Sequence, residues 1–289
     1  MKVELVSKQI IKPSSPTPQN LGIYKLSFID QITPIFHTRM LFFYPNIENK
    51  FANDGIERLK TSLSVTLTHF CPLAGRVKDN KVIECNDKGV EFCETRVRVH
   101  GFLSEILKQP DPDIVHQFVP VNDAHLGSGI ADASTIGSFI KAWSCTAIGC
   151  MAESMLPKYV MESHFPSMEF SNDLPPLELK TSNCITRRFV FESSEITKLK
   201  AKSSSKLVEQ PTRVEAILAL IWKCATMASR TNLGITKRPS KVGQVINIRK
   251  RTNPPLPETS LGNCLSNFVA EMEESRVVQI WTYRHWWFT

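Results

Sequence analysis

The 289-residue chain lacks the features by which several protein classes are recognised. None of its eight cysteines forms a C-x-x-C pair, so we expect no zinc site. It has no internal repeat and no G-x-G-x-x-G or Walker pattern for phosphates. Its N-terminus has no apolar signal region, and its longest apolar helical stretch, Val214 to Met227, is too short to span a bilayer. These absences predict a cytoplasmic protein with reduced cysteines, no metal and no membrane partner.

The composition is that of a globular protein with an excess of positive charge. Hydrophobic residues make up 42% of the chain, which is enough for a core, and the formal net charge is +7. Such a charge favours anionic ligands, for example a phosphorylated cofactor. The basic residues gather at Lys237-Arg238, Lys241 and Arg249-Lys250-Arg251, where no aromatic residues interleave. This pattern argues against single-stranded nucleic acid, and the alternatives are a cofactor contact or a solvated basic face.

Predicted strands and helices alternate along the chain without strict βαβ regularity, so we expect an α/β fold of two mixed domains. Residues 171–183 carry two prolines and no periodicity, as an interdomain linker would. The expected domains are therefore residues 1–170 and 184–289. The expected strands are residues 3–12, 23–28, 39–44, 81–85, 90–99, 187–191, 242–249 and 264–272, and the expected helices are residues 53–70, 134–148, 193–202 and 212–229.

The chain is organised around the stretch from Gly127 to Trp143. Its second half predicts a helix, because Ile136, Phe139, Ile140 and Trp143 fall on one face. Ser134 is the expected N-cap of this helix. Asp132 stands just before it, where an acid belongs either to an active site or to a cap or turn.

Several separated stretches resemble the plant BAHD acyl-CoA-dependent acyltransferases, and in particular their alkaloid acetyltransferases. Residues 130–133 (I-A-D-A) match the end of the family's S-H-K-I-A-D-A segment, which carries an H-x-x-x-D motif. The other matching stretches are L-S-F-I-D-Q at 26–31, F-C-P-L-A-G-R at 70–76, R-V-E-A at 213–216, N-I-R at 247–249 and L-G-N at 261–263. Together they cover about residues 3–275.

The resemblance implies a chloramphenicol acetyltransferase-like fold of two domains with a channel between them. It implies a monomeric enzyme that transfers an acyl group from acyl-CoA to a hydroxyl of a plant specialised metabolite such as an alkaloid. The expected donor is acetyl-CoA. The partners would be acyl-CoA as co-substrate and the alcohol acceptor.

The chain departs from the family pattern at the catalytic position. Ser128 stands where the motif has its His, and none of the seven histidines is followed by Asp four residues later. A serine hydroxyl does not accept a proton near neutral pH, so Ser128 does not replace the base. The family's D-F-G-W-G motif is also absent, and we expect an incomplete second domain. The alternative function is therefore a truncated, catalytically inactive relative that binds at most a small molecule or a partner.

The resemblance also implies roles for individual residues. Asp132 would support the geometry of the site by pairing with Arg249, and Asn263 would lie near the acyl group unless it is only a turn residue after Gly262. Lys250 and Arg251 belong to the basic region, and on their charge they are the candidates to meet the CoA phosphates, with a solvated basic face as the alternative. His125, three residues before Ser128, is a candidate substitute base, and its alternative is a surface-loop histidine.

Overall fold

The computed structural model describes residues 2–33, 40–44, 53–98, 103–108, 117–118, 131–169, 187–206, 208–233 and 239–272. The chain divides into two compact units. Unit 1 comprises Met1–Thr181 and Asn247–Leu265, and unit 2 comprises Ser182–Ile246 and Ser266–Thr289. Residues 247–265, which we expected within the second domain, thus belong to unit 1.

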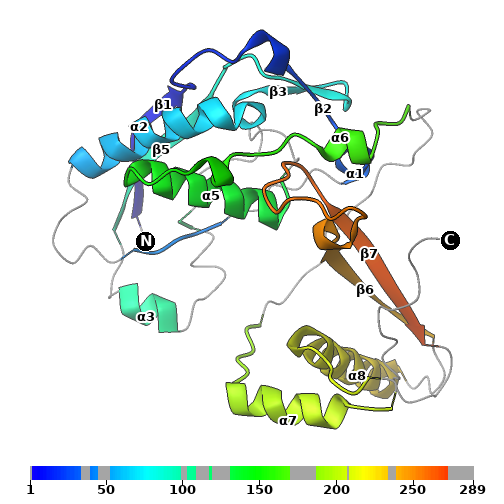
Figure 1. The fold of residues 1–289 in the computed structure, drawn as a ribbon. Coiled ribbons are helices and arrows are strands. Elements are labelled where there is room, and N and C mark those ends of the chain that lie inside the picture. The colour runs from blue at the N-terminus through cyan, green and yellow to red at the C-terminus, as the bar shows by residue number, and fades with distance from the viewer. Residues whose placement is uncertain are drawn as a thin grey trace. The chain divides into compact units, whose positions relative to one another are not determined.

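The described strands of unit 1 form two small sheets (Figure 1). β1 (Lys2–Ile11) pairs antiparallel with β5 (Val90–Arg98), with a register shift between Leu5 and Ser7. In the second sheet β4 (Val82–Glu84) lies between β2 (Ile23–Lys25) and β3 (Arg76–Lys78), and both pairings are antiparallel. The predicted strands at 3–12, 81–85 and 90–99 are therefore confirmed within a few residues.

The helices of unit 1 include two long ones, α2 (Asn53–His69) and α5 (Ala133–Ala147). They lie side by side in Figure 1. Among the described residues, the shorter α-helices are α1 (Phe28–Ile32), α3 (Leu103–Lys108) and α6 (Met161–His164). Single 3₁₀ turns occupy Gln19–Leu21, Cys71–Ala74, Glu153–Met155 and Arg249–Arg251.

The apolar face predicted for α5 packs against α2. Phe139 and Trp143 pack against the cluster that contains the buried Leu63 and Leu67. The rings of Phe139 and Phe70 lie edge to face, with 5.4 Å between their centroids. The Trp143 indole also donates hydrogen bonds to the Leu59 carbonyl and the Ser62 hydroxyl. Burial of this face fixes α5, and with it the residues at the start of the helix.

Unit 2 contains α7 (Ser193–Ser203) beside α8 (Arg213–Leu233), and a two-stranded sheet of β6 (Ser240–Asn247) and β7 (Leu265–Met272) (Figure 1). α8 opens with the capping box that the sequence predicts, because Thr212 and Glu215 exchange hydrogen bonds. Within the described residues, no helix of either unit is both long and apolar enough to cross a membrane.

Four predicted strands differ from the structure. Residues 40–44 and 187–191 are not strands. The strand expected over 23–28 ends at Lys25, because Ser27 and Asp30 form a capping box that starts α1. The strand expected over 242–249 ends at Asn247, and Arg249 lies in a 3₁₀ turn. The predicted linker, residues 171–183, lies outside the described residues.

Candidate functional site

Asp132, not Ser134, is the N-cap of α5, and our sequence prediction of the cap was wrong by two residues. The Asp132 carboxylate accepts a hydrogen bond of 2.8 Å from the Thr135 backbone N–H, and α5 begins at Ala133. Asp and Ser are almost equally good caps, so local sequence does not choose between them. The Ser134 hydroxyl instead accepts a hydrogen bond of 2.7 Å from the Asn247 side chain.

The same carboxylate forms a two-point ion pair with Arg249. Nη1 lies 2.6 Å from Oδ2 and Nη2 lies 3.1 Å from Oδ1. Both side chains are buried, with 0% of Arg249 and 1% of Asp132 exposed. The structure thus brings together the two residues that the family resemblance pairs. The planar fork of a guanidinium suits this arrangement, which a lysine ammonium does not reproduce.

Four donors surround the Asp132 carboxylate. Oδ1 accepts from Thr135 N–H and from Arg249, and Oδ2 accepts from Arg249 and from the Cys264 backbone N–H at 3.0 Å. Each oxygen therefore receives two hydrogen bonds. A carboxylate held in this way has no free lone pair directed at a substrate, so its role is to hold the structure together.

The Arg249 guanidinium also reaches the segment that follows it in the chain. Its Nη2 donates to the carbonyls of Ser260 at 3.0 Å and Gly262 at 2.9 Å, and lies 3.3 Å from the Thr135 hydroxyl. The Thr135 hydroxyl in turn donates to the Gly262 carbonyl and accepts from the Gly262 N–H. Arg249 and Thr135 together tie residues 260–264 to the first turn of α5.

A second buried acid, Asp30, holds the same segment. One oxygen accepts a hydrogen bond of 2.7 Å from the Asn263 backbone N–H, and the other accepts from the backbone and hydroxyl of Ser27. Burial raises the pKa of Asp30, while hydrogen bonds from Asn263 and Ser27 oppose that rise. Asn263 is 2% exposed, and its side chain also bonds to Asp30. The Asn263 side chain is therefore hydrogen-bonded to a buried acid in the core.

Gly262 lies where these contacts converge. Its φ of +128° is one that side chains rarely adopt, and an added Cβ would lie 3.1 Å from Met161 Cγ, 3.1 Å from the Tyr24 hydroxyl and 3.2 Å from Asp30 Oδ2. The Tyr24 hydroxyl donates a hydrogen bond to the neighbouring Leu261 carbonyl at 2.8 Å. Close packing on all sides therefore requires glycine at this position.

The other predicted site residues lie elsewhere. Ser128 and His125 fall outside the described residues, as does the stretch after Met272. Lys250 is exposed and forms a surface ion pair of 2.9 Å with Glu258. Arg251 is also exposed and donates to the Asn247 carbonyl. The structure therefore gathers Asp132, Arg249 and Asn263 in the core and leaves Lys250 and Arg251 at the surface.

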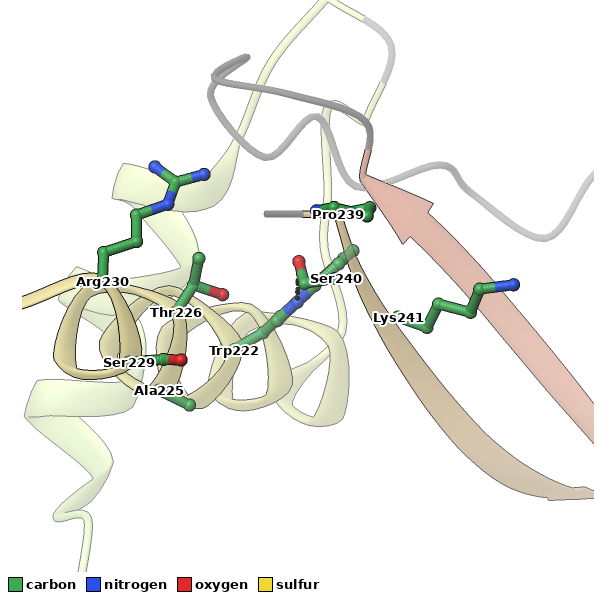
Figure 2. A pocket seen from close by; sticks show the side chains of 8 residues that line it. All are labelled: Trp222, Ala225, Thr226, Ser229, Arg230, Pro239, Ser240 and Lys241. Carbon is green, nitrogen blue, oxygen red and sulfur yellow. Dashed lines mark hydrogen bonds between the residues drawn. The ribbon is translucent and has the colours of Figure 1, made fainter. Parts of the chain in front are cut away.

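Unit 2 has a pocket of its own, about 370 Å³ in volume, between the end of α8 and the start of β6. Trp222 donates a hydrogen bond of 3.1 Å to the Ser240 hydroxyl on one side of it (Figure 2). Arg230 lines it as well, and two of its buried nitrogens have no hydrogen-bond partner among the residues that the structure describes. Lys241, part of the predicted basic region, forms an ion pair with Glu271. The described residues that line the pocket include no acid or imidazole side chain that could serve as a base.

Two residues of the buried network, Asp30 and Thr135, were not predicted as site residues. Asp30 had a readable signal, because S-x-x-D at 27–30 is a capping-box pattern. Thr135 had none, since the partners of its hydroxyl, Gly262 and Arg249, lie more than a hundred residues away in the chain. Among the described residues, no group of three or more His, Cys, Asp or Glu side chains is placed to hold a metal ion.

The chain, with its α/β fold and its buried carboxylate–guanidinium pair at the start of α5, is similar to known proteins. A model of the Transferase family matches residues 1–129 and 124–280. Akuammiline synthase 1 from Alstonia scholaris is 40% identical over 91% of this chain and 67% of its own length. Stemmadenine O-acetyltransferase from Catharanthus roseus is 34% identical over 95% of the chain and 72% of its length.

Solved structures agree with the sequence comparisons. The crystal structure of vinorine synthase superimposes with a TM-score of 0.81 at 32% identity, over 94% of this chain and 71% of that one. The chain therefore belongs to the Transferase family of BAHD acyltransferases, and its predicted fold class is confirmed. The chain spans about two thirds of the length of the akuammiline synthases, 66% for one and 67% for the other.

Proposed function

We propose that the protein is an O-acyltransferase that moves an acyl group from acyl-CoA to a hydroxyl of a plant alkaloid. The observation that carries this proposal is the Asp132–Arg249 pair, which preserves the architecture of the family's motif segment with good geometry. The names of the similar proteins support the acceptor class, since one of them acetylates an oxygen of stemmadenine. They also make acetyl-CoA the first donor to test.

The reaction needs a base for the acceptor hydroxyl and donors for the oxyanion that develops on the thioester carbonyl. Asp132 is saturated by hydrogen bonds and does not meet the first need. The sequence offers Ser128 at the position of the family's His, and His125 three residues earlier. General-base catalysis typically contributes about 10²–10⁴-fold, so we propose an acyltransferase with turnover reduced by about that factor.

The second candidate function is a relative without turnover that binds a small molecule or a partner. The absence of any H-x-x-x-D sequence in the chain favours it, because the base is then missing altogether. The two candidates share one scaffold and differ in whether His125 substitutes for the base.

The deciding assay follows release of free CoA thiol from acetyl-CoA with a panel of alkaloid alcohols, with product identified by mass spectrometry. Slow, acceptor-dependent release that disappears in His125→Ala supports the acyltransferase. No release above the rate without protein, alongside measurable acceptor binding, supports the second candidate. Turnover equal to that of an intact relative contradicts the reduced rate.

A further inference from the structure

The C-terminal end of α5 places two cysteines opposite each other. Gly149 has a φ of +73°, and its N–H donates to the Thr146 carbonyl at 3.2 Å. The next N–H, that of Cys150, reaches back to the Cys145 carbonyl at 2.8 Å. These two bonds define a Schellman motif, in which the residues at the two ends of the longer bond bring their side chains together. Here those two residues are Cys145 and Cys150.

The backbone bond sets the separation of the two cysteines. The path from one Cα to the other crosses one hydrogen bond of 2.8 Å and three covalent bonds, and it is bent. The Cα atoms are therefore less than about 7 Å apart, which allows the separation of about 4.4–6.8 Å that a disulfide requires. The neighbouring Cys145 side chain raises the pKa of the Cys150 thiol, in agreement with this placement.

Solvent has access to this pair. Cys150 is exposed and Cys145 is half-buried, whereas Cys71, Cys85 and Cys264 are buried. The pKa of Cys150 is raised, so this thiol is not activated by its surroundings. The pair is distinguished by proximity. After one thiol has reacted, the attack of the other is an intramolecular step.

We propose that Cys145 and Cys150 are a dithiol modification site that low-molecular-weight disulfides convert reversibly into an intramolecular disulfide. One cysteine thiolate attacks the added disulfide and forms a mixed disulfide, which releases one small thiol. The other cysteine then attacks the protein sulfur of that mixed disulfide and releases the second small thiol. The protein loses two protons and two electrons, and the added disulfide takes them up and is reduced to two thiols.

The test treats the fully reduced full-length chain with oxidised glutathione, blocks the remaining thiols by alkylation and digests with trypsin. Cleavage after Lys141 and Lys158 gives one peptide that contains both cysteines and no other. We expect this peptide to be unalkylated and lighter by two hydrogen atoms, and to return to the dithiol form on reduction. Recovery with two alkyl groups, or with two glutathiones, would overturn the proposal.

Variants separate proximity from general reactivity. Cys150→Ser should leave Cys145 with a stable mixed glutathione disulfide, like the exposed Cys224 in its own peptide. Gly149→Val should reduce formation of the internal disulfide several-fold, because a β-branched residue at positive φ disrupts the turn without changing either thiol. Gly137→Val in the same helix, where an added Cβ meets nothing within 4 Å, is the matched control. Equal disulfide yields in the two glycine variants would contradict the role of the turn.

Discussion

Asp132 and Arg249 lie 117 positions apart in the sequence and meet in the core through hydrogen bonds of 2.6 and 3.1 Å. One partner caps α5 and the other follows β6, so the pair fixes the start of the helix against the returning chain. The acid has an architectural role even though the motif's histidine is absent.

Removal of this acid should destabilise the protein strongly. Asp132→Ala leaves the Arg249 guanidinium buried without its carboxylate and also removes the N-cap of α5. Breaking a buried pair typically costs about 3–5 kcal/mol, and we expect a loss of unfolding free energy of that order in urea denaturation. Glu258→Ala breaks the exposed pair with Lys250 and should change stability by about 1 kcal/mol or less. Similar losses of unfolding free energy in the two variants would show that the buried pair contributes no more to stability than the exposed pair.

Alanine should have opposite effects at two glycines. Gly262→Ala places a Cβ about 3 Å from the side chains of Met161, Tyr24 and Asp30 at a positive φ, so we expect a loss of about 2 kcal/mol or more. Gly137→Ala adds a methyl group to an exposed helical position with open space, and should stabilise by about 0.5–1 kcal/mol. Thermal unfolding of both variants gives the comparison. A neutral Gly262→Ala would contradict the packing described around residue 262.

Stability should decline in alkaline solution. Burial raises the pKa of Cys264 from 9.0 to about 11, so the folded state keeps a proton that the unfolded chain releases above pH 9. The unfolded state then binds fewer protons, and the free energy of unfolding falls as pH rises, by at most about 1.4 kcal/mol per pH unit for one group. Cys264→Ala should show a shallower decline between about pH 9 and pH 10.5. Parallel pH curves for the two proteins would count against this assignment.

Restoring the histidine should raise activity. Ser128→His recreates the H-x-x-x-D spacing with Asp132, and a general base typically contributes about 10²–10⁴-fold. We expect acetyl transfer from acetyl-CoA to rise within that range in the thiol-release assay, with Ser128→Ala as the control that leaves the rate unchanged. If Ser128→His folds normally and remains at the level of the starting chain, the site lacks more than its base.

Local sequence was enough to predict a helix where apolar residues recur with the helical period. The apolar face of α5, with Phe139 and Trp143, follows from the helical period, and α8 follows from its capping box. The helix α1 was missed because five residues are too few to show a period. The cap of α5 was misplaced because Asp132 and Ser134 satisfy the same local rule, and the choice between them depends on distant contacts.

The network around residues 260–264 could not be read from pattern at all. Asp30 and Asn263 are 233 positions apart, and no spacing rule connects a capping acid to a loop amide at that separation. The Asp132–Arg249 contact was expected from family resemblance alone. The resemblance did not indicate that Asn263 would pair with a second buried acid.

The two acids impose an order on the assembly of unit 1 during synthesis. The ribosome makes Asp30 and Asp132 long before residues 249–264, which supply their partners. Until that segment emerges, the two acids lack Arg249 and the backbone N–H groups of Asn263 and Cys264, so their burial is unfavourable and closure of the core is opposed. Contacts of such long sequence separation also fold slowly. Completion of unit 1 therefore waits for the chain to pass through unit 2 and return.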